Sequence, residues 1–209
     1  MPRVGLNREK LVATAMAMAD EGGLAALSMH ALARHYGVAA PSMYKHVRNL
    51  EDLQCAIASE ALTLFEHALS GAEPGIAGLA RAYRTFATGH PGLYEATQRP
   101  VLFREDGAQE TSSRIISRIA AQLPENLTPD DVVHHVRIIR SALHGFVELE
   151  RTEGFGLPQS LDATFDELCT SLQVMTSLGG VEASKTARPP ANALRDVPGR
   201  NHSASATRR

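Results

Sequence analysis

The stretch LSMHALARHYGVAAPSMYKHVRNLEDL, residues 27–53, decides the fold of this chain. Ser28 stands just before a run of apolar residues at helical spacing, and a serine side chain can accept a hydrogen bond from a free N–H of a first helical turn. Gly37 ends that run, because glycine enters the left-handed conformation at no steric cost. Pro41 suits the first turn of the next helix. The stretch therefore predicts two short helices joined at a glycine.

The same stretch predicts how the two helices meet and what they face. Ala33 is small enough to let two helices cross closely, and Met43 can anchor the second helix in the shared core. Between Gly22 and Leu50 there is no carboxylate, so phosphate can approach without repulsion. The basic and imidazole side chains of this segment are His30, Arg34, His35, Lys45, His46 and Arg48. This combination predicts a helix-turn-helix that binds DNA.

The end of the stretch resembles the N-terminal domain of the tetracycline-repressor (TetR) family. That family ends its recognition helix in Leu-Tyr-x-His-Phe, followed by Lys-x-x-Leu, and this chain has Met-Tyr-Lys-His-Val at 43–47 and Arg-Asn-Leu at 48–50. The resemblance implies that Tyr44 and His46 contact phosphates, and that residues 40–42 and Lys45 face bases or the adjacent backbone. The whole DNA-contacting set implied in this way is Ser28, Ala39, Ala40, Pro41, Ser42, Tyr44, Lys45, His46 and Arg48.

One departure from the family pattern concerns the fourth helix. Leu50 stands where many members of the family carry a lysine, which removes one phosphate contact, and Arg48 can compensate. The competing interpretation of the whole stretch is a compact helical hairpin with no role in DNA binding.

Composition bounds the chain without identifying it. With 209 residues and 44% hydrophobic side chains it can bury one good core and a small second domain, and its formal net charge of -2 does not indicate a nucleic-acid binder. Cys55 and Cys169 are a sparse pair that we expect to be reduced and structural. No apolar run approaches the ~20 residues of a membrane span, and no signal-peptide pattern is present. We therefore expect a soluble, cytoplasmic protein with no membrane partner.

The pattern of the remaining chain predicts an all-α fold. A first helix capped by Asn7 completes a three-helix DNA-binding domain at 1–48, and a connecting helix is expected at 50–69. A helical effector-binding and dimerisation domain is expected at 70–182, with helices near 76–89, 91–98, 109–123, 129–152 and 160–178. The tail at 183–209 has few large apolar residues, so we expect it to be disordered.

A second resemblance covers this C-terminal part. Some TetR-like regulators carry Trp-His-Gly late in a long helix, followed by a Gly-Phe-Gly-Leu-Pro loop. This chain has Leu-His-Gly at 143–145, with leucine in place of the tryptophan, and Gly-Phe-Gly-Leu-Pro at 154–158. Arg-Ala-Tyr-Arg at 81–84 and His-Pro-Gly-Leu-Tyr at 90–94 fit the same pattern. The two resemblances cover most of residues 7–178 and imply no particular effector.

Apolar side chains on more than one face of the last two helices predict a homodimer. A terminal helix that is apolar on several sides needs a partner on its outer side, and two helices from each chain can form a four-helix interface. Two heads about 34 Å apart would match a palindromic operator. The alternative is that this apolar surface belongs to the core of a monomer. The predicted interface residues are Leu143, Phe165, Leu168 and Leu172.

A regulator also needs an input, and the sequence offers candidates for an apolar small-molecule pocket with a few polar groups. They are Tyr83, Phe86, Tyr94, Phe103, His135, Ile139 and Phe146. Aromatic residues at helical spacing are more often part of a core than of a pocket wall. An effector bound there would shift the connecting helix and change the separation of the heads. We expect repression, since occlusion of an operator asks nothing more of the sequence.

Catalysis is not expected. The chain has no Glu-x-x-His pair, Gly-x-Ser-x-Gly turn, phosphate loop or dinucleotide fingerprint, so we expect no cofactor and no metal. The spacing nearest to a metal motif is Asp131 and His134, but His134 and His135 point about 100° apart on a helix. The remaining alternative to a DNA-binding regulator is a helical adaptor that binds another protein and uses its N-terminal hairpin structurally.

Overall fold

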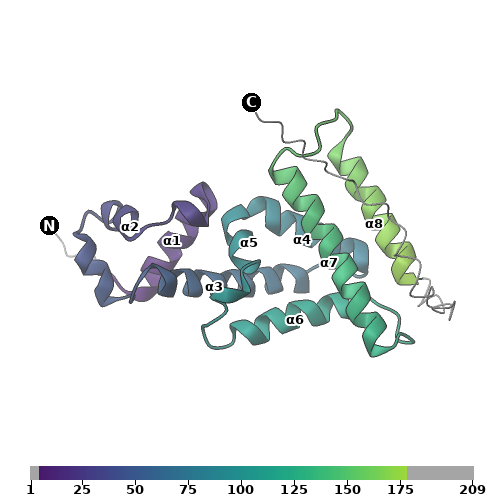
Figure 1. The fold of residues 1–209 in the computed structure, drawn as a ribbon, viewed down its shortest axis with the longest axis horizontal. Coiled ribbons are helices and arrows are strands. Elements are labelled where there is room, and N and C mark those ends of the chain that lie inside the picture. Colours follow the sequence, from purple (N-terminus) through teal and green to yellow (C-terminus); the bar gives the residue numbers. More distant parts are fainter. Residues whose placement is uncertain (1–4, 178–209) are drawn as a thin grey trace, which may run out of the picture.

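The computed structural model describes residues 5–177, and all of its regular structure is helical. The N-terminal part, which we call the head (residues 8–49), contains α1 (Arg8–Gly22), the short 3₁₀ helix η1 (Leu24–Ala26), α2 (Met29–His35) and the 3₁₀ helix η2 (Ala40–Lys45). The long helix α3 (Leu50–Ser70) runs from the head into the rest of the molecule, as Figure 1 shows.

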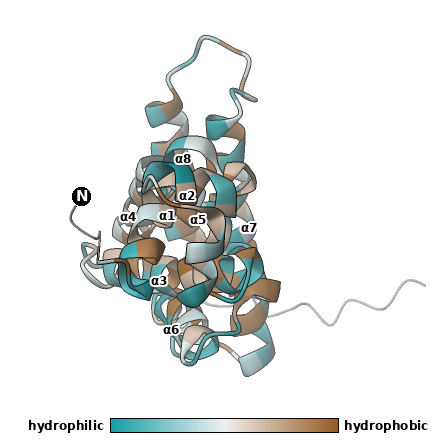
Figure 2. Cartoon of the chain, turned by 90° about the vertical axis from the view of Figure 1, so that its left-hand side faces the viewer, coloured by the Kyte–Doolittle hydropathy of each residue, from teal (hydrophilic) through white to brown (hydrophobic). Residues whose placement is uncertain are grey.

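The body (residues 76–177) is a layer of helices around the distal part of α3. It consists of α4 (Ile76–Gly89), α5 (Pro91–Thr97), η3 (Pro100–Leu102), α6 (Ala108–Ala120), α7 (Pro129–Arg151) and α8 (Leu161–Ser177). In Figure 1, α5 and α6 lie on opposite sides of α3, while α7 and α8 cross the end of the body far from the head. The loop between α7 and α8 projects from the top of Figure 2.

The predicted helices match the observed ones to within about three residues at each end. Capping explains the starts: the Asn7 side chain accepts the Lys10 N–H at 2.9 Å, Asn49 accepts the Asp52 N–H at 2.7 Å, and Thr128 begins α7. Two short 3₁₀ helices, η1 and η3, were not predicted. The predicted tail at 183–209 and the last residues of the predicted C-terminal domain, 178–182, lie outside the described residues.

The head joins the body through a close crossing of α1 and α5. A Cβ atom at Gly92 would lie 1.9 Å from the backbone oxygen of Ala19, so only glycine permits this approach. Asp20 secures the joint, because its carboxylate accepts the Leu93 N–H at 3.0 Å and lies 2.9 Å from Nδ1 of His90. The His-Pro-Gly-Leu-Tyr motif at 90–94 thus serves to attach the head.

One continuous apolar core extends from the head into the body. Figure 2, viewed from the head, shows many hydrophilic segments at the periphery of the helices. Within residues 5–177 no helix is both long enough and apolar enough to cross a membrane.

Candidate nucleic-acid interface

The start of α2 is built by Ser28 and its end by Gly37. The Ser28 hydroxyl accepts the Ala31 N–H at 3.1 Å, as expected of an N-cap. Gly37 takes a φ of +63°, and the chain reversal lets the Val38 N–H donate to the Ala33 carbonyl at 3.0 Å. This left-handed turn sends the chain directly into η2.

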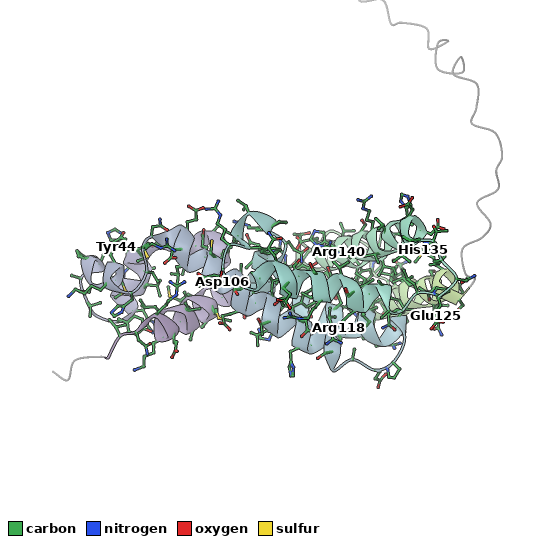
Figure 3. The ribbon with its side chains drawn as sticks, turned by 90° about the horizontal axis from the view of Figure 1, so that it is seen from below. Tyr44, Asp106, Arg118, Glu125, His135 and Arg140 are labelled. Carbon is green, nitrogen blue, oxygen red and sulfur yellow. The ribbon has the colours of Figure 1, made fainter. Side chains whose placement is uncertain are left out.

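The segment η2, which holds several of the predicted DNA-contacting residues, is a 3₁₀ helix, whereas the sequence predicted an α-helix there. Two buried side chains anchor η2 to the rest of the head: Met43 within η2 and Val47 shortly after it. With this anchor in place, the Tyr44 side chain projects outward and is 52% exposed, and Lys45 is exposed beside it. Figure 3 shows Tyr44 at the outer end of the head, far from the body.

The other residues of the predicted DNA-contacting set surround this segment. Ala39 and Pro41 are exposed, and Ser28, Ala40, Ser42 and His46 are partly buried. Each of these residues is therefore at least partly open to solvent. Tyr36, which sequence reasoning did not single out, braces the head, because its hydroxyl lies 2.6 Å from Thr14 Oγ1 and donates to the Lys10 carbonyl at 2.9 Å.

Arg48 is highly exposed, and it also shares a carboxylate with Arg8. Asp52 Oδ2 accepts the Arg48 backbone N–H at 3.0 Å, and its two oxygens lie 3.0 Å from Arg8 and 3.2 Å from the Arg48 guanidinium. Burial opposes ionisation of Asp52, but the hydrogen bond from Arg48 and the charge of Arg8 outweigh it and lower the pKa of this carboxyl. Asp52, in the first turn of α3, thus fixes the position of Arg48.

Charge on the head is distributed unevenly. Three carboxylates lie close to the end of η2, and each is paired with an arginine: Glu51, Asp52 and Glu105. No residue from 24 to 47 takes part in an ion pair with another described residue. A surface with exposed cations and no local anion attracts a polyanion.

The predicted effector residues fall into separate groups. Tyr83, Phe86 and Tyr94 form a buried aromatic cluster around Phe65, with ring centroids 4.9 to 6.1 Å from the Phe65 ring. The hydroxyls of Tyr83 and Tyr94 are 2.7 Å apart, and that of Tyr94 lies 2.6 Å from Nδ1 of His144. The two motifs at 90–94 and 143–145 therefore meet at this hydrogen bond. Burial raises the pKa of both tyrosines.

The remaining predicted effector residues lie elsewhere. Phe146 packs against Phe155 and Phe165 on the opposite side of α7, with ring centroids 4.9 and 5.0 Å away. His135 is partly exposed near the start of α7, with Nδ1 2.7 Å from the Asp131 carbonyl, and Figure 3 places it at the end of the molecule away from the head. Phe103 and Ile139 are buried. These seven residues do not line one common cavity.

A small cavity does adjoin the aromatic cluster. Its volume is about 20 Å³, and Tyr83 is the one predicted effector residue in its wall. Sequence reasoning missed the polar groups there, Thr97, Ser112 and Arg140, because single polar residues on predicted helices give no signal of their own. The full lining is Leu62, Phe65, Tyr83, Thr97, Ser112, Ile115, Ile116, Ile119 and Arg140.

The prediction of the dimer interface needs correction. Leu143, Phe165 and Leu172 are 0%, 2% and 4% exposed, because they pack within the single chain between α4, α7 and α8. A partner cannot reach them. Of the four predicted residues only Leu168 is partly exposed. The apolar side chains that α7 and α8 leave exposed are instead Val133, Ile138, Leu149 and Val174.

No group of three or more His, Cys, Asp or Glu side chains that could hold a metal ion occurs within residues 5–177. Cys55 and Cys169 are both buried and free, and burial raises the pKa of each thiol. Neither is therefore a reactive thiolate at neutral pH.

Comparison with known proteins agrees with this architecture. Residues 11–54 match the family described as bacterial regulatory proteins, tetR family, and residues 76–172 match the tetracyclin repressor-like C-terminal domain. The HTH-type transcriptional regulator YobS of Bacillus subtilis (strain 168) is 32% identical over an alignment of 162 positions, which covers 74% of this chain and 84% of YobS. The chain belongs to the tetR family of bacterial regulatory proteins. It is a DNA-binding transcriptional regulator.

Two further comparisons extend the likeness over most of the chain. The HTH-type transcriptional regulator Rv0681 of Mycobacterium tuberculosis is 31% identical over an alignment of 191 positions, which covers 86% of this chain and 87% of Rv0681. A variant of TetR from Acinetobacter baumannii AYE, solved in complex with minocycline, has the same fold with a TM-score of 0.58. It is 21% identical, and the alignment covers 83% of this chain and 97% of that one.

Proposed function

We propose that this chain is a ligand-responsive repressor that binds a palindromic operator as a homodimer. The observation that carries the proposal is the pair Tyr44 and Lys45, which are exposed beside the buried Met43 in a segment of the chain that has no carboxylate. The domain division 1–48, 50–69 and 70–182 forms part of the proposal. So does a place of action in the cytoplasm, where bacterial DNA lies.

Exposed positions on α7 support a dimer with a new interface. Ile138, Ala142, Gly145 and Leu149 recur at helical spacing along one side of α7 and are exposed or partly exposed. Outside its own helical turn, no atom of residues 5–177 lies within 4 Å of a Cβ built at Gly145, so no contact within this part of the chain requires the glycine. A mid-helix glycine is costly, and close approach of a partner helix would account for it. Leu168 and Val174 on α8 would extend this interface.

The effector site we propose centres on the aromatic cluster. Tyr83, Phe86 and Tyr94 remain its candidate wall, together with Phe103 and Ile139, and His144, Thr97 and Arg140 add polar groups. A cavity of about 20 Å³ is far below the ~300 Å³ of a typical small-molecule site, so binding requires α6 and α7 to separate. A largely apolar effector would then favour the opened state and change the position of α3. His135 and Phe146 lie apart from this cluster and are not retained.

The decisive experiment is selection of bound fragments from genomic DNA with the purified full chain. Enrichment of one motif with two inverted half-sites is the expected result. Lys45→Ala should then weaken binding to this motif by at least about tenfold and lower the slope of log affinity against log salt by about one. Arg137→Ala, which removes the same charge from the exposed side of α7, should leave the affinity unchanged. Equal, weak binding to all fragments would contradict the proposal and favour the adaptor alternative.

Sizing chromatography of surface variants tests the dimer. Ile138→Asp should give monomers, because a charge would be buried against the partner. Leu64→Asp, at a similarly exposed leucine of α3, is the matched control and should remain dimeric. If Ile138→Asp remains dimeric, the dimer interface does not include this face of α7.

A further inference from the structure

A cavity lies between the head and the body, apart from the aromatic cluster. Its volume is about 480 Å³, within the ~300–1,000 Å³ of small-molecule sites. Side chains of α1, α3 and the loop between η3 and α6 enclose it, and in Figure 3 this loop, marked by Asp106, lies at the junction of head and body. The lining is Arg8, Glu9, Val12, Ala13, Met16, Ala56, Ser59, Glu60 and Glu105.

The wall of this cavity combines an apolar base with acidic edges. Val12 and Ala56 are buried and Met16 is partly buried, so an occupant can desolvate apolar surface against them. Three glutamates and one arginine give the lining a formal charge of -2. This combination selects against anions and against fully hydrated ions.

The single cation of the lining is already engaged. Arg8 lies 2.6 Å from Glu105 and 3.0 Å from Asp52, so it neutralises one glutamate of the wall and a carboxylate behind it. Glu9 and Glu60 are exposed and form no ion pair with any residue from 5 to 177. Their charge remains available to a ligand, and they come from different helices, α1 and α3.

We propose that this cavity is a second small-molecule site, which takes an organic monocation with an apolar body. The apolar part of the ligand packs on Val12, Met16 and Ala56, and its charge lies between Glu9 and Glu60. Since the wall includes α1 of the head and Glu105 of the body, such a ligand touches both sides of the joint. This proposal goes beyond the effector site in the body and does not depend on it.

The test is calorimetric titration of the full chain with tetraphenylphosphonium. Tetraphenylborate is the matched control ligand, because it has the same shape and the opposite charge. We expect saturable binding of one tetraphenylphosphonium per chain and no binding of tetraphenylborate. The double variant Glu9→Gln and Glu60→Gln should weaken tetraphenylphosphonium about fivefold or more. Glu125→Gln, labelled at the far end of the molecule in Figure 3, should leave the affinity unchanged.

A filling variant separates charge from shape. Ala13 is exposed in the wall, so Ala13→Phe should abolish binding by occupying the cavity while the melting temperature stays the same. Binding that is unaffected by the glutamate pair and by Ala13→Phe would overturn the proposal and place the ligand elsewhere.

Discussion

In the body, Arg84 pairs with Glu150 and Asp162, and Arg118 pairs with Glu66, whereas Arg34 and Lys45 of the head have no carboxylate partner among residues 5–177. The same charge therefore serves two purposes. Body arginines hold helices together: Arg84 links α4 to α7 and α8 and lies 4.7 Å from the ring centroid of Phe165. Arg8 and Arg48 of the head are also paired, but Arg34 and Lys45 form no such link between helices and remain available for phosphate.

The comparison has two exceptions that sharpen it. Arg137 and Arg140 on α7 are exposed and pair with no carboxylate in the described part of the chain. Arg140 lines the small cavity beside Tyr83, which is where the body is proposed to bind its effector. Pairing over a long distance in the sequence, as at Arg84 and Arg118, thus marks joints between helices, whereas Arg99, Arg114 and Arg151 pair locally with a residue three or four positions away.

The largest expected effect is at the crossing of α1 and α5, which joins the head to the body. Gly92→Ala puts a Cβ atom 1.9 Å from the Ala19 carbonyl oxygen, so α5 must move away from α1. We expect a loss of about 3 kcal/mol in the free energy of unfolding, measured by urea denaturation. Gly89→Ala is the control: nothing lies within 4 Å of its Cβ, and stability should be unchanged or slightly higher. Equal effects of the two variants would show that α1 and α5 do not cross closely.

Arg84→Ala tests the paired side of the comparison. Arg84 and Glu150 are each only 18% exposed, so removing the guanidinium leaves a largely buried carboxylate without its partner. Allowing for solvent screening, we expect a loss of about 2 kcal/mol, or roughly 5 °C in melting temperature. Arg114→Ala, at an exposed pair with Glu110, should cost no more than about 0.5 kcal/mol. Lys45→Ala in the head should not change the melting temperature at all.

The two buried, hydrogen-bonded tyrosines of the body, Tyr83 and Tyr94, predict that the free energy of unfolding falls at alkaline pH. Burial raises the pKa of Tyr94 and Tyr83 above the ordinary value near 10, so the folded protein keeps protons that the unfolded chain releases. Stability is therefore full below about pH 10 and falls as the pH rises above it, by up to about 1.4 kcal/mol per pH unit for one tyrosine. Tyr94→Phe should flatten this fall in melts between pH 8 and 11. An unchanged slope would contradict the assignment.

Local signals in the sequence predicted local structure well. Ser28, Gly37 and Asn7 act through hydrogen bonds and backbone angles within a few residues of themselves, so their roles follow from the sequence alone. The buried position of Met43 was predicted correctly, because it is a large apolar residue within a short, mostly polar segment. The geometry of the segment was not predicted, since α and 3₁₀ helices differ in one hydrogen-bond register.

Long-range pairing was not predictable in the same way. Helical periodicity identified Leu143 and Phe165 as apolar, but it cannot say whether such a residue packs on its own chain or on a second one. It likewise grouped Tyr83 with Phe146, which the fold places on different sides of α7. The polar partners of a site, such as His144 and Arg140, became visible only once helices distant in sequence were placed together.

Gly145→Ala has the smallest expected effect. The direction of the change in the dimer dissociation constant decides whether this face of α7 contacts a partner or water. In an isolated chain the added methyl meets nothing within 4 Å, so alanine should raise helix stability by up to about 1 kcal/mol. If a partner helix packs against this position, the same methyl pushes the helices apart and the dimer dissociation constant rises. We expect weaker dimers in analytical ultracentrifugation together with a more stable monomer. Gly89→Ala, at an open helical glycine outside the proposed interface, should leave the dissociation constant unchanged. A more stable protein with undiminished dimerisation would show that the exposed stripe of α7 faces water, like the cations of the head before DNA binds.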